Sequence, residues 1–199
     1  MRLIRPAVLY IAAGLGAIAA VVFFTTRDGP SQPVTAVDYS AVMQLRSGDM
    51  KKLNFHPAPK PVSTNAFESE SGTAMTLADY KGKYILLNFW ATWCTPCRRE
   101  MPMLSEMQAS LGGDNFAVVT LATGRNPPPA IKKFFTEIGV DNLPRHRDPK
   151  SLLGNEMGVF GLPVTLILDP SGNEIARLTG DAEWNSDSAK AIISALITQ

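Results

Sequence analysis

The sequence predicts an α/β fold in which a mixed central sheet carries helices on both faces. Two observations lead to this prediction. Apolar runs with the character of buried strands alternate along the chain with segments of helical periodicity, which is typical of layered α/β domains. Near the C-terminus a turn at residues 170–173, Pro-Ser-Gly-Asn, joins two short strands, and this hairpin makes the sheet mixed.

The first segment of the chain is predicted to be a membrane anchor at residues 1–26. Residues 7–24 carry no charge and, as a helix, would extend roughly 27 Å, close to the apolar thickness of a bilayer. Arg2 and Arg5 precede this run, which places the N-terminus in the cytoplasm and the remaining chain across the membrane. The alternative is a signal peptide cleaved after Ala19, although the apolar run continues to Phe24.

Residues 27–59 are predicted to be a linker. Polar and turn-forming residues begin it, residues 40–47 are predicted to form a short helix, and Pro57, Pro59 and Pro61 favour an extended stretch. The compact domain is then expected at residues 60–199.

Within that domain the pattern predicts each element in turn. We expect a hairpin from residues 62–66 and 72–77, a turn or short helix at 76–80, strands at 84–90, 116–122, 164–169 and 174–178, and helices at 95–111, 128–138, 151–157 and 186–197. The run at 84–90 is almost continuously apolar, as in a strand buried on both faces.

Composition excludes several classes of function. The formal net charge of +1 and the absence of a basic block give no reason to expect a nucleic-acid partner. Only two residues separate the two cysteines. A disulfide that closes so short a loop would add little to the stability of the fold, so a mainly structural bridge is not expected. Arg98 stands where a haem-attachment motif needs histidine, and a zinc site would need more ligands than two cysteines and the distant His56 and His146. We therefore expect neither a metal nor another cofactor.

The pair Cys94 and Cys97 points instead to thiol-disulfide exchange. It follows a buried strand and opens a predicted helix, where free backbone N–H groups and the helix dipole favour a thiolate. Cys94 is the candidate nucleophile that forms a mixed disulfide with a partner, and Cys97, one turn later, resolves it. Pro96 suits an early helical position because it lacks an N–H.

Residues 81–102 read KGKYILLNFWATWCTPCRREMP, and this run resembles the thioredoxin superfamily. More narrowly it is similar to the membrane-anchored thiol-disulfide oxidoreductases of the TlpA, ResA and CcmG type. The resemblance covers residues 60–199 and is closest to the TlpA group, through FWATWC at 89–94 and GDAEW at 180–184. It implies a thioredoxin-like three-layer sandwich.

The resemblance also implies roles for individual residues. Trp93 flanks the cysteine pair and shields the reactive sulfur, and Pro96 lies between the two cysteines; both are expected to contact the substrate. Leu162 and Pro163 match the family's cis-proline loop, which offers its backbone to the partner. Pro102 matches the position at which the active-site helix bends, and a proline inside a helix also favours a bend on physical grounds.

Two further positions bear on proton transfer. Asn88 stands where thioredoxins carry a buried aspartate, and an amide cannot accept the proton. Glu100 matches the acidic residue of ResA-like members and is the candidate base for Cys97. The alternative is a solvated Glu100 on the helix surface.

Other conspicuous residues have structural explanations. Met101, Met103 and Met107 fit a packed helix face better than a soft-metal site. His146 is expected in an exposed loop, and Trp184 is expected to pack the C-terminal helix against the sheet.

These expectations combine into one functional hypothesis. The chain is expected to be a monomeric, single-pass inner-membrane protein whose catalytic domain lies in the periplasm. Resemblance to the TlpA group implies that it reduces the cysteines of a copper chaperone or of the copper-bearing oxidase subunit, and that a DsbD/CcdA-type membrane protein supplies electrons. Apocytochrome c is the alternative client. A non-catalytic binding module is a second alternative, but the paired cysteines argue against it because a binder needs no resolving thiol. A peroxidase is also disfavoured, because its reactive cysteine would not be paired in this way.

Overall fold

The computed structural model describes residues 38–198. The predicted membrane anchor and the first part of the predicted linker lie outside the described residues. No helix within residues 38–198 is both long enough and apolar enough to span a bilayer. The described residues 38–198 belong to one compact unit, so the boundary expected at Lys60 falls inside it.

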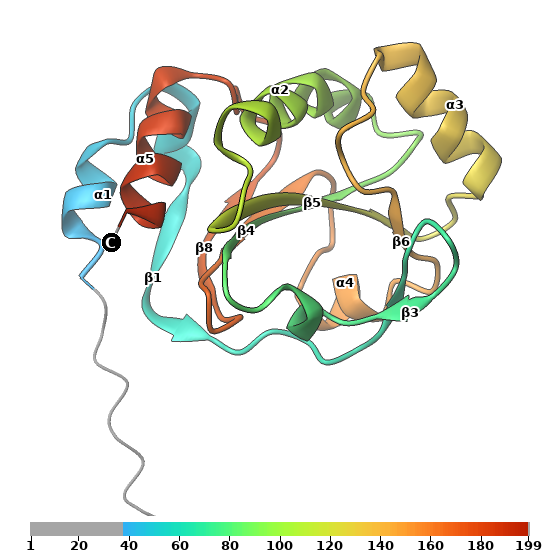
Figure 1. Ribbon diagram of the computed structural model, residues 1–199, viewed down its shortest axis with the longest axis horizontal. Helices are drawn as coiled ribbons and strands as arrows, with labels where there is room; N and C mark the ends of the chain where they lie inside the picture. The colour runs from blue at the N-terminus through green and yellow to red at the C-terminus, as the bar shows by residue number, and fades with distance from the viewer. Residues whose placement is uncertain (1–37, 199) are drawn as a thin grey trace, which may run out of the picture. The chain divides into compact units, whose positions relative to one another are not determined.

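Figure 1 shows the order of the elements along this unit. The helical segments and strands are α1 Ser40–Gln44, η1 Gly48–Lys52, β1 Asn54–Lys60, β2 Phe67–Glu68, β3 Ala74–Met75, η2 Leu77–Tyr80, β4 Tyr84–Trp90, α2 Thr95–Leu111, β5 Phe116–Thr123, α3 Pro128–Ile138, β6 His146–Asp148, α4 Leu152–Glu156, β7 Val164–Leu168, β8 Glu174–Thr179 and α5 Asp187–Ile197.

In the described part of the chain, eight strands form one mixed sheet in the order β1-β8-β7-β4-β5-β6-β2-β3. Strands β4, β5 and β6 are parallel, whereas β7 and β8 join β4 as an antiparallel hairpin. The predicted α/β class and mixed sheet are therefore confirmed.

Helices cover both faces of this sheet, because successive side chains of β4 point to opposite sides. Leu86 and Trp90 pack with α2, α3 and α5 on one face. Ile85, Leu87 and Phe89 pack on the other face with residues of η2 and α4. Figure 1 shows the same division, with α2, α3 and α5 above the sheet and α4 below it.

The elements before Lys60 complete the first of these two layers. Tyr39 and Val42 of the α1 region, Met50 of η1 and Leu53 are buried in the cluster that also holds residues of α2 and α5. Strand β1 pairs with β8 at the edge of the sheet. The stretch at residues 54–60, expected as extended linker, is thus an edge strand of the domain, and its prolines are tolerated there because an edge strand leaves one side unpaired.

Two local expectations are wrong. The N-terminal hairpin has its second arm, β3, within residues 72–77 as predicted, but its first arm is β2 at Phe67–Glu68 instead of residues 62–66. His146 is buried on β6 instead of lying in an exposed loop, and its ring forms a hydrogen bond with the Tyr80 hydroxyl. Burial lowers the pKa of His146, because the charged form loses hydration.

Candidate active site

Cys94 and Cys97 form a disulfide at the start of α2, with an S–S distance of 2.01 Å. Cys94 is the N-cap residue of this helix, and the backbone N–H of Cys97 donates a hydrogen bond to Cys94 Sγ at 3.2 Å. In the reduced protein the same N–H and the positive end of the helix would stabilise a Cys94 thiolate. Cys94 is 5% exposed and Cys97 is fully buried, which makes Cys94 the sulfur that a partner can reach.

The chain leading to the cysteines is held from two sides. Strand β4, whose six residues from Ile85 to Trp90 are all buried, ends directly before it. The backbone N–H and the hydroxyl of Thr92 both donate to Asn126 Oδ1, at 2.8 and 2.9 Å. Asn126 follows β5 and is itself buried. The sequence gives no local signal for this role of Asn126, because its partner Thr92 lies 34 residues away.

The Leu162–Pro163 peptide bond is cis, as the family resemblance implied. This loop lies beside the cysteines, because Val164 pairs with Phe89 at the carboxyl end of β4. Leu162 also packs against the cluster that contains both cysteines. The structure therefore brings the two predicted substrate-binding segments, at residues 93–97 and 162–163, to one edge of the sheet.

Two aromatic side chains are conspicuously exposed on these segments. Trp93 precedes Cys94 and is 69% exposed, and Phe160 precedes the cis-proline loop and is 88% exposed. Each lies next to a segment that reaches the cysteine end of the sheet, so both are candidates for contact with a partner. Phe160 could not be recognised from the sequence, since no local pattern separates an exposed phenylalanine from a buried one.

Glu100 is fully buried and lies three residues after Cys97 on α2. Asn88 Nδ2 donates to Glu100 Oε1 at 2.7 Å, and the indole N–H of Trp184 donates to Oε2 at 3.3 Å. Burial raises the pKa of Glu100 to about 7, against the opposing effect of these two hydrogen bonds and of a third from the backbone of Ala182. A carboxyl group with this pKa can accept or release a proton near neutral pH.

This geometry decides between the two interpretations of Glu100, since the solvated helix-surface alternative is wrong. Residues three apart on a helix lie on the same side, so Glu100 and Cys97 are neighbours. Asn88 points toward α2 and takes part in the site as a hydrogen-bond donor. Trp184 packs in the core as expected, but its contact with Glu100 joins positions 84 residues apart and was not anticipated.

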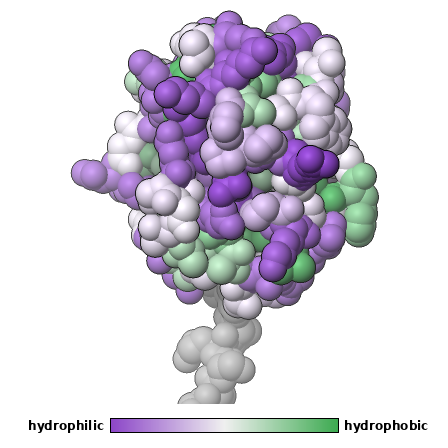
Figure 2. Space-filling view, turned by 90° about the vertical axis from the view of Figure 1, so that its right-hand side faces the viewer, coloured by the Kyte–Doolittle hydropathy of each residue, from purple (hydrophilic) through white to green (hydrophobic). Residues whose placement is uncertain are grey.

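A cavity of about 340 Å³ lies elsewhere, against α3. It is lined by Glu70, Pro128, Pro129, Ile131, Lys132, Arg145 and Arg147, and so by neither cysteine nor Glu100. Figure 2 shows the face on that side of the molecule, which is mostly hydrophilic with small apolar areas.

Residues 38–198 contain no group of three or more histidine, cysteine, aspartate or glutamate side chains suited to hold a metal ion. The disulfide itself assigns the redox chemistry to the end of the sheet at which the cysteines lie.

Comparisons with known proteins agree with this assignment. The model of the AhpC/TSA family matches residues 56–176. The chain is 34% identical over 109 residues to thiol-disulfide oxidoreductase ResA of Geobacillus thermodenitrificans, a match that covers 55% of this chain and 62% of that protein. It is 31% identical over 113 residues to ResA of Bacillus subtilis, covering 57% and 62% of the two chains. The matched part thus spans about three fifths of the length of these relatives.

Solved structures show a similar fold. A DsbF homologue from Corynebacterium diphtheriae superimposes with a TM-score of 0.60 at 28% identity, covering 75% of this chain and 96% of that one. The pneumococcal exposed lipoprotein thioredoxin of Streptococcus pneumoniae superimposes with a TM-score of 0.56 at 27% identity, covering 69% and 100%. The described chain therefore has a thioredoxin-like α/β fold.

Proposed function

The chain belongs to the AhpC/TSA family, and from this premise we propose that it is a thiol-disulfide oxidoreductase that reduces disulfides in client proteins. One observation carries the proposal. A cysteine pair that forms a disulfide lies at the N-terminus of α2, and one turn later the same helix carries a buried carboxyl group whose pKa is about 7. A binding module would need neither the second cysteine nor the carboxyl group.

The reaction consumes the reduced form of the protein. The Cys94 thiolate attacks one sulfur of the client disulfide, and the other client sulfur leaves as a thiolate. Cys97 then loses its proton to Glu100 and attacks Cys94 Sγ. The bond between Cys94 and the client breaks, so the second client thiolate leaves and the Cys94–Cys97 disulfide forms. Two electrons pass from the dithiol to the client, and a second dithiol must later reduce the protein again.

The client is proposed to dock across the exposed aromatic side chains beside Cys94. Trp93 and Phe160 border the two segments that meet at the cysteines, and both can cover an apolar side chain of a partner without first unfolding anything. The cis-proline loop at Leu162 and Pro163 would pair with the backbone of the client, as the resemblance to the family implies. An apolar client segment next to an accessible disulfide fits this surface.

The cellular setting is proposed from the sequence. Residues 1–26 would anchor the protein in the inner membrane, with the catalytic domain in the periplasm. Thiols tend to be oxidised outside the cytoplasm, so a reductant there needs a dedicated supply of electrons, for which a DsbD/CcdA-type membrane protein is the proposed donor. The similarity to the TlpA group favours cysteines of copper-site assembly, in a copper chaperone or an oxidase subunit, as the client.

The decisive experiment is a trap for the client. Cys97→Ser should accumulate a mixed disulfide between Cys94 and the client, because the resolving thiol is missing. Cys94→Ser is the matched control and should trap nothing. If Cys97→Ser recovers no partner that carries a disulfide, the proposed reaction is wrong.

The same experiment identifies the kind of client. A trapped protein with a copper-binding cysteine pair would support the proposed role in oxidase assembly. A trapped protein with a Cys-x-x-Cys-His sequence would instead assign the chain to cytochrome c maturation. Redox equilibration with glutathione gives the direction of electron flow. A reductant should have a reduction potential of about −270 mV, and an oxidant one of about −120 mV.

A further inference from the structure

Both carboxylate oxygens of Glu100 are held by neutral donors from different parts of the chain. Asn88, in the middle of β4, donates to Oε1, and Trp184, in the loop between β8 and α5, donates to Oε2. All three side chains are buried, with Trp184 only 1% exposed. Water therefore cannot replace either donor without a rearrangement of the core.

The Asn88 side of this arrangement is fixed within the sheet. The second hydrogen of the Asn88 amide is donated to Thr165 Oγ1 at 2.9 Å. Asn88 and Thr165 are direct neighbours in the pairing of β4 with β7, so both side chains point to the same face. Trp184 lies in a loop and not in the sheet, so other contacts must hold its indole N–H in place.

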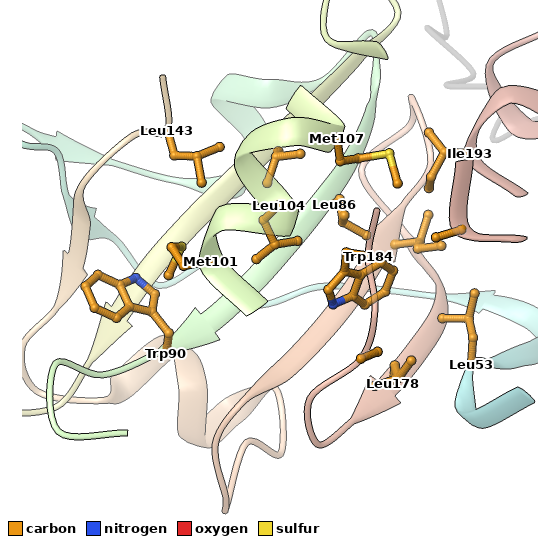
Figure 3. Packing of buried hydrophobic residues seen from close by; sticks show 14 of the residues in the cluster. Leu53, Leu86, Trp90, Met101, Leu104, Met107, Leu143, Leu178, Trp184 and Ile193 are labelled. Carbon is orange, nitrogen blue, oxygen red and sulfur yellow. The ribbon is translucent and has the colours of Figure 1, made fainter. Parts of the chain in front are cut away.

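The loop that carries Trp184 is held by the segment before β1. Lys52 Nζ donates to the backbone carbonyl of Asp181 at 2.8 Å, and the backbone N–H of Glu183 donates to Asp49 Oδ2 at 3.3 Å. Figure 3 shows Leu53, Leu178 and Trp184 at one end of the buried cluster and Trp90 at the other. This supporting segment lies before residue 56, outside the part of the chain that matches the family.

Few charged groups reach the surroundings of Glu100. Among residues 38–198 the carboxylate that acts on it is Asp181, in the Trp184 loop, and it raises the pKa of Glu100 only slightly compared with burial. Arg99 binds Asp181 at 2.6 Å, and Lys52 also acts on Asp181. Cys97 lies three residues before Glu100 on the same helix. The backbone of Ala182, also in the Trp184 loop, is a third hydrogen-bond partner that lowers the pKa of Glu100. The hydrogen bonds to the carboxylate therefore come from neutral donors.

We propose that Trp184 is a positioning residue, whose indole N–H holds Glu100 Oε2 and so sets the pH at which Glu100 accepts the proton of Cys97. This inference rests on the proposed function, in which Glu100 serves the resolving step. A donor hydrogen bond favours the ionised form of a carboxyl group. Without the indole N–H, the protonated form of Glu100 is favoured up to a higher pH, and the resolving step needs a higher pH in turn.

The test uses 5,5′-dithiobis(2-nitrobenzoate) as the disulfide, with the reduced full-length protein. Attack by Cys94 releases one thionitrobenzoate anion, and attack by Cys97 on Cys94 Sγ releases the second. The two phases are followed by absorbance in stopped flow over a range of pH. In the wild type, the second phase should rise with a midpoint near the pKa of Glu100, which is about 7.

Trp184→Phe removes the N–H and keeps an aromatic ring. We expect it to move the midpoint of the second phase upward by about one pH unit and to leave the first phase unchanged. Trp90→Phe is the matched control, since Trp90 is fully buried in the same cluster and its Nε1 has no hydrogen-bond partner among residues 38–198. It should leave the midpoint in place.

Each outcome separates this inference from the proposed function. An unshifted midpoint in Trp184→Phe, with the midpoint abolished in Glu100→Gln, overturns the role of Trp184 and keeps that of Glu100. An unchanged profile in Glu100→Gln refutes the proton step of the proposed function and the role of Trp184 with it. Equal shifts in Trp184→Phe and Trp90→Phe would reduce Trp184 to a packing residue. If Trp184→Phe does not fold, benzothienylalanine at position 184, which has sulfur in place of the N–H, tests the same prediction.

Discussion

Glu100→Gln should remove a pH dependence of stability that the wild type carries. Burial raises the pKa of Glu100 from the ordinary value of 4.5 to about 7, so the folded protein holds this proton more tightly than the unfolded chain does. The resulting stabilisation is complete below pH 4.5 and is lost as the pH rises through 7. The glutamine side chain stays neutral and has no such term.

The size of the effect follows from the two pKa values. Each pH unit of difference is worth roughly 1.4 kcal/mol, so Glu100 should lower the free energy of unfolding by roughly 3 kcal/mol between acidic and mildly alkaline pH. Other groups change their pKa on folding too, with Glu174 and Asp181 lowered. They are present in both proteins and cancel in the difference between wild type and variant.

The assay is urea unfolding of the oxidised protein at several pH values between about 4 and about 9. The stability of Glu100→Gln relative to wild type should rise with pH across the window from 4.5 to 7. Glu106→Gln, on the exposed side of the same helix, is the control and should run parallel to the wild type. Parallel curves for Glu100→Gln would refute the claim that Glu100 is a buried carboxyl group with a raised pKa.

Three further predictions concern stability. Burial would raise the pKa of Glu174, but hydrogen bonds from Arg177 and His56 outweigh it and lower the pKa. Glu174→Gln should therefore lower the free energy of unfolding by about 2 kcal/mol at neutral pH. In chemical unfolding, the difference in stability between wild type and variant should shrink as the pH falls below 4.5 and through the lowered pKa. Phe134→Ala should cost about 4 kcal/mol in the same assay, because the ring is buried 4.6 Å from that of Trp90; a loss below about 1 kcal/mol would contradict this packing. Gly139 ends α3 with a φ of 67°, so Gly139→Ala should lower stability by about 1 kcal/mol, whereas Gly113→Ala, with a negative φ and open space around it, should leave the melting temperature unchanged.

Local features of the chain were predictable where a pattern is complete within one element. The buried strand β4, helix α2 with its cysteines at the N-terminus, and helix α3 have the predicted bounds. Each combines a clear apolar run or helical periodicity with a marked start, such as Pro96 and Pro128 in the first turn of a helix. The redox pair needed only a strand, a turn and a helix start, which are adjacent in sequence.

Elements that depend on a distant partner were placed less well. Strand β1 has prolines that argue against a strand, and it exists because β8 offers it an edge. Strand β6 has only three residues, too few for a pattern, and its histidine is buried because Phe67 and Tyr80 pack against the ring. Neither neighbour is near in sequence, so local periodicity could not reveal them.

The same division runs through the candidate site. The sequence by itself determined the chemistry, because thiol-disulfide exchange depends on the residue types Cys94 and Cys97 and on their position at the start of a helix. Only the tertiary structure decided the surroundings of Glu100, the proposed proton acceptor. The burial of Glu100, its two donors and its raised pKa arise where β4, α2 and the Trp184 loop meet, and hydration and hydrogen bonding at such a junction depend on segments far apart in the chain.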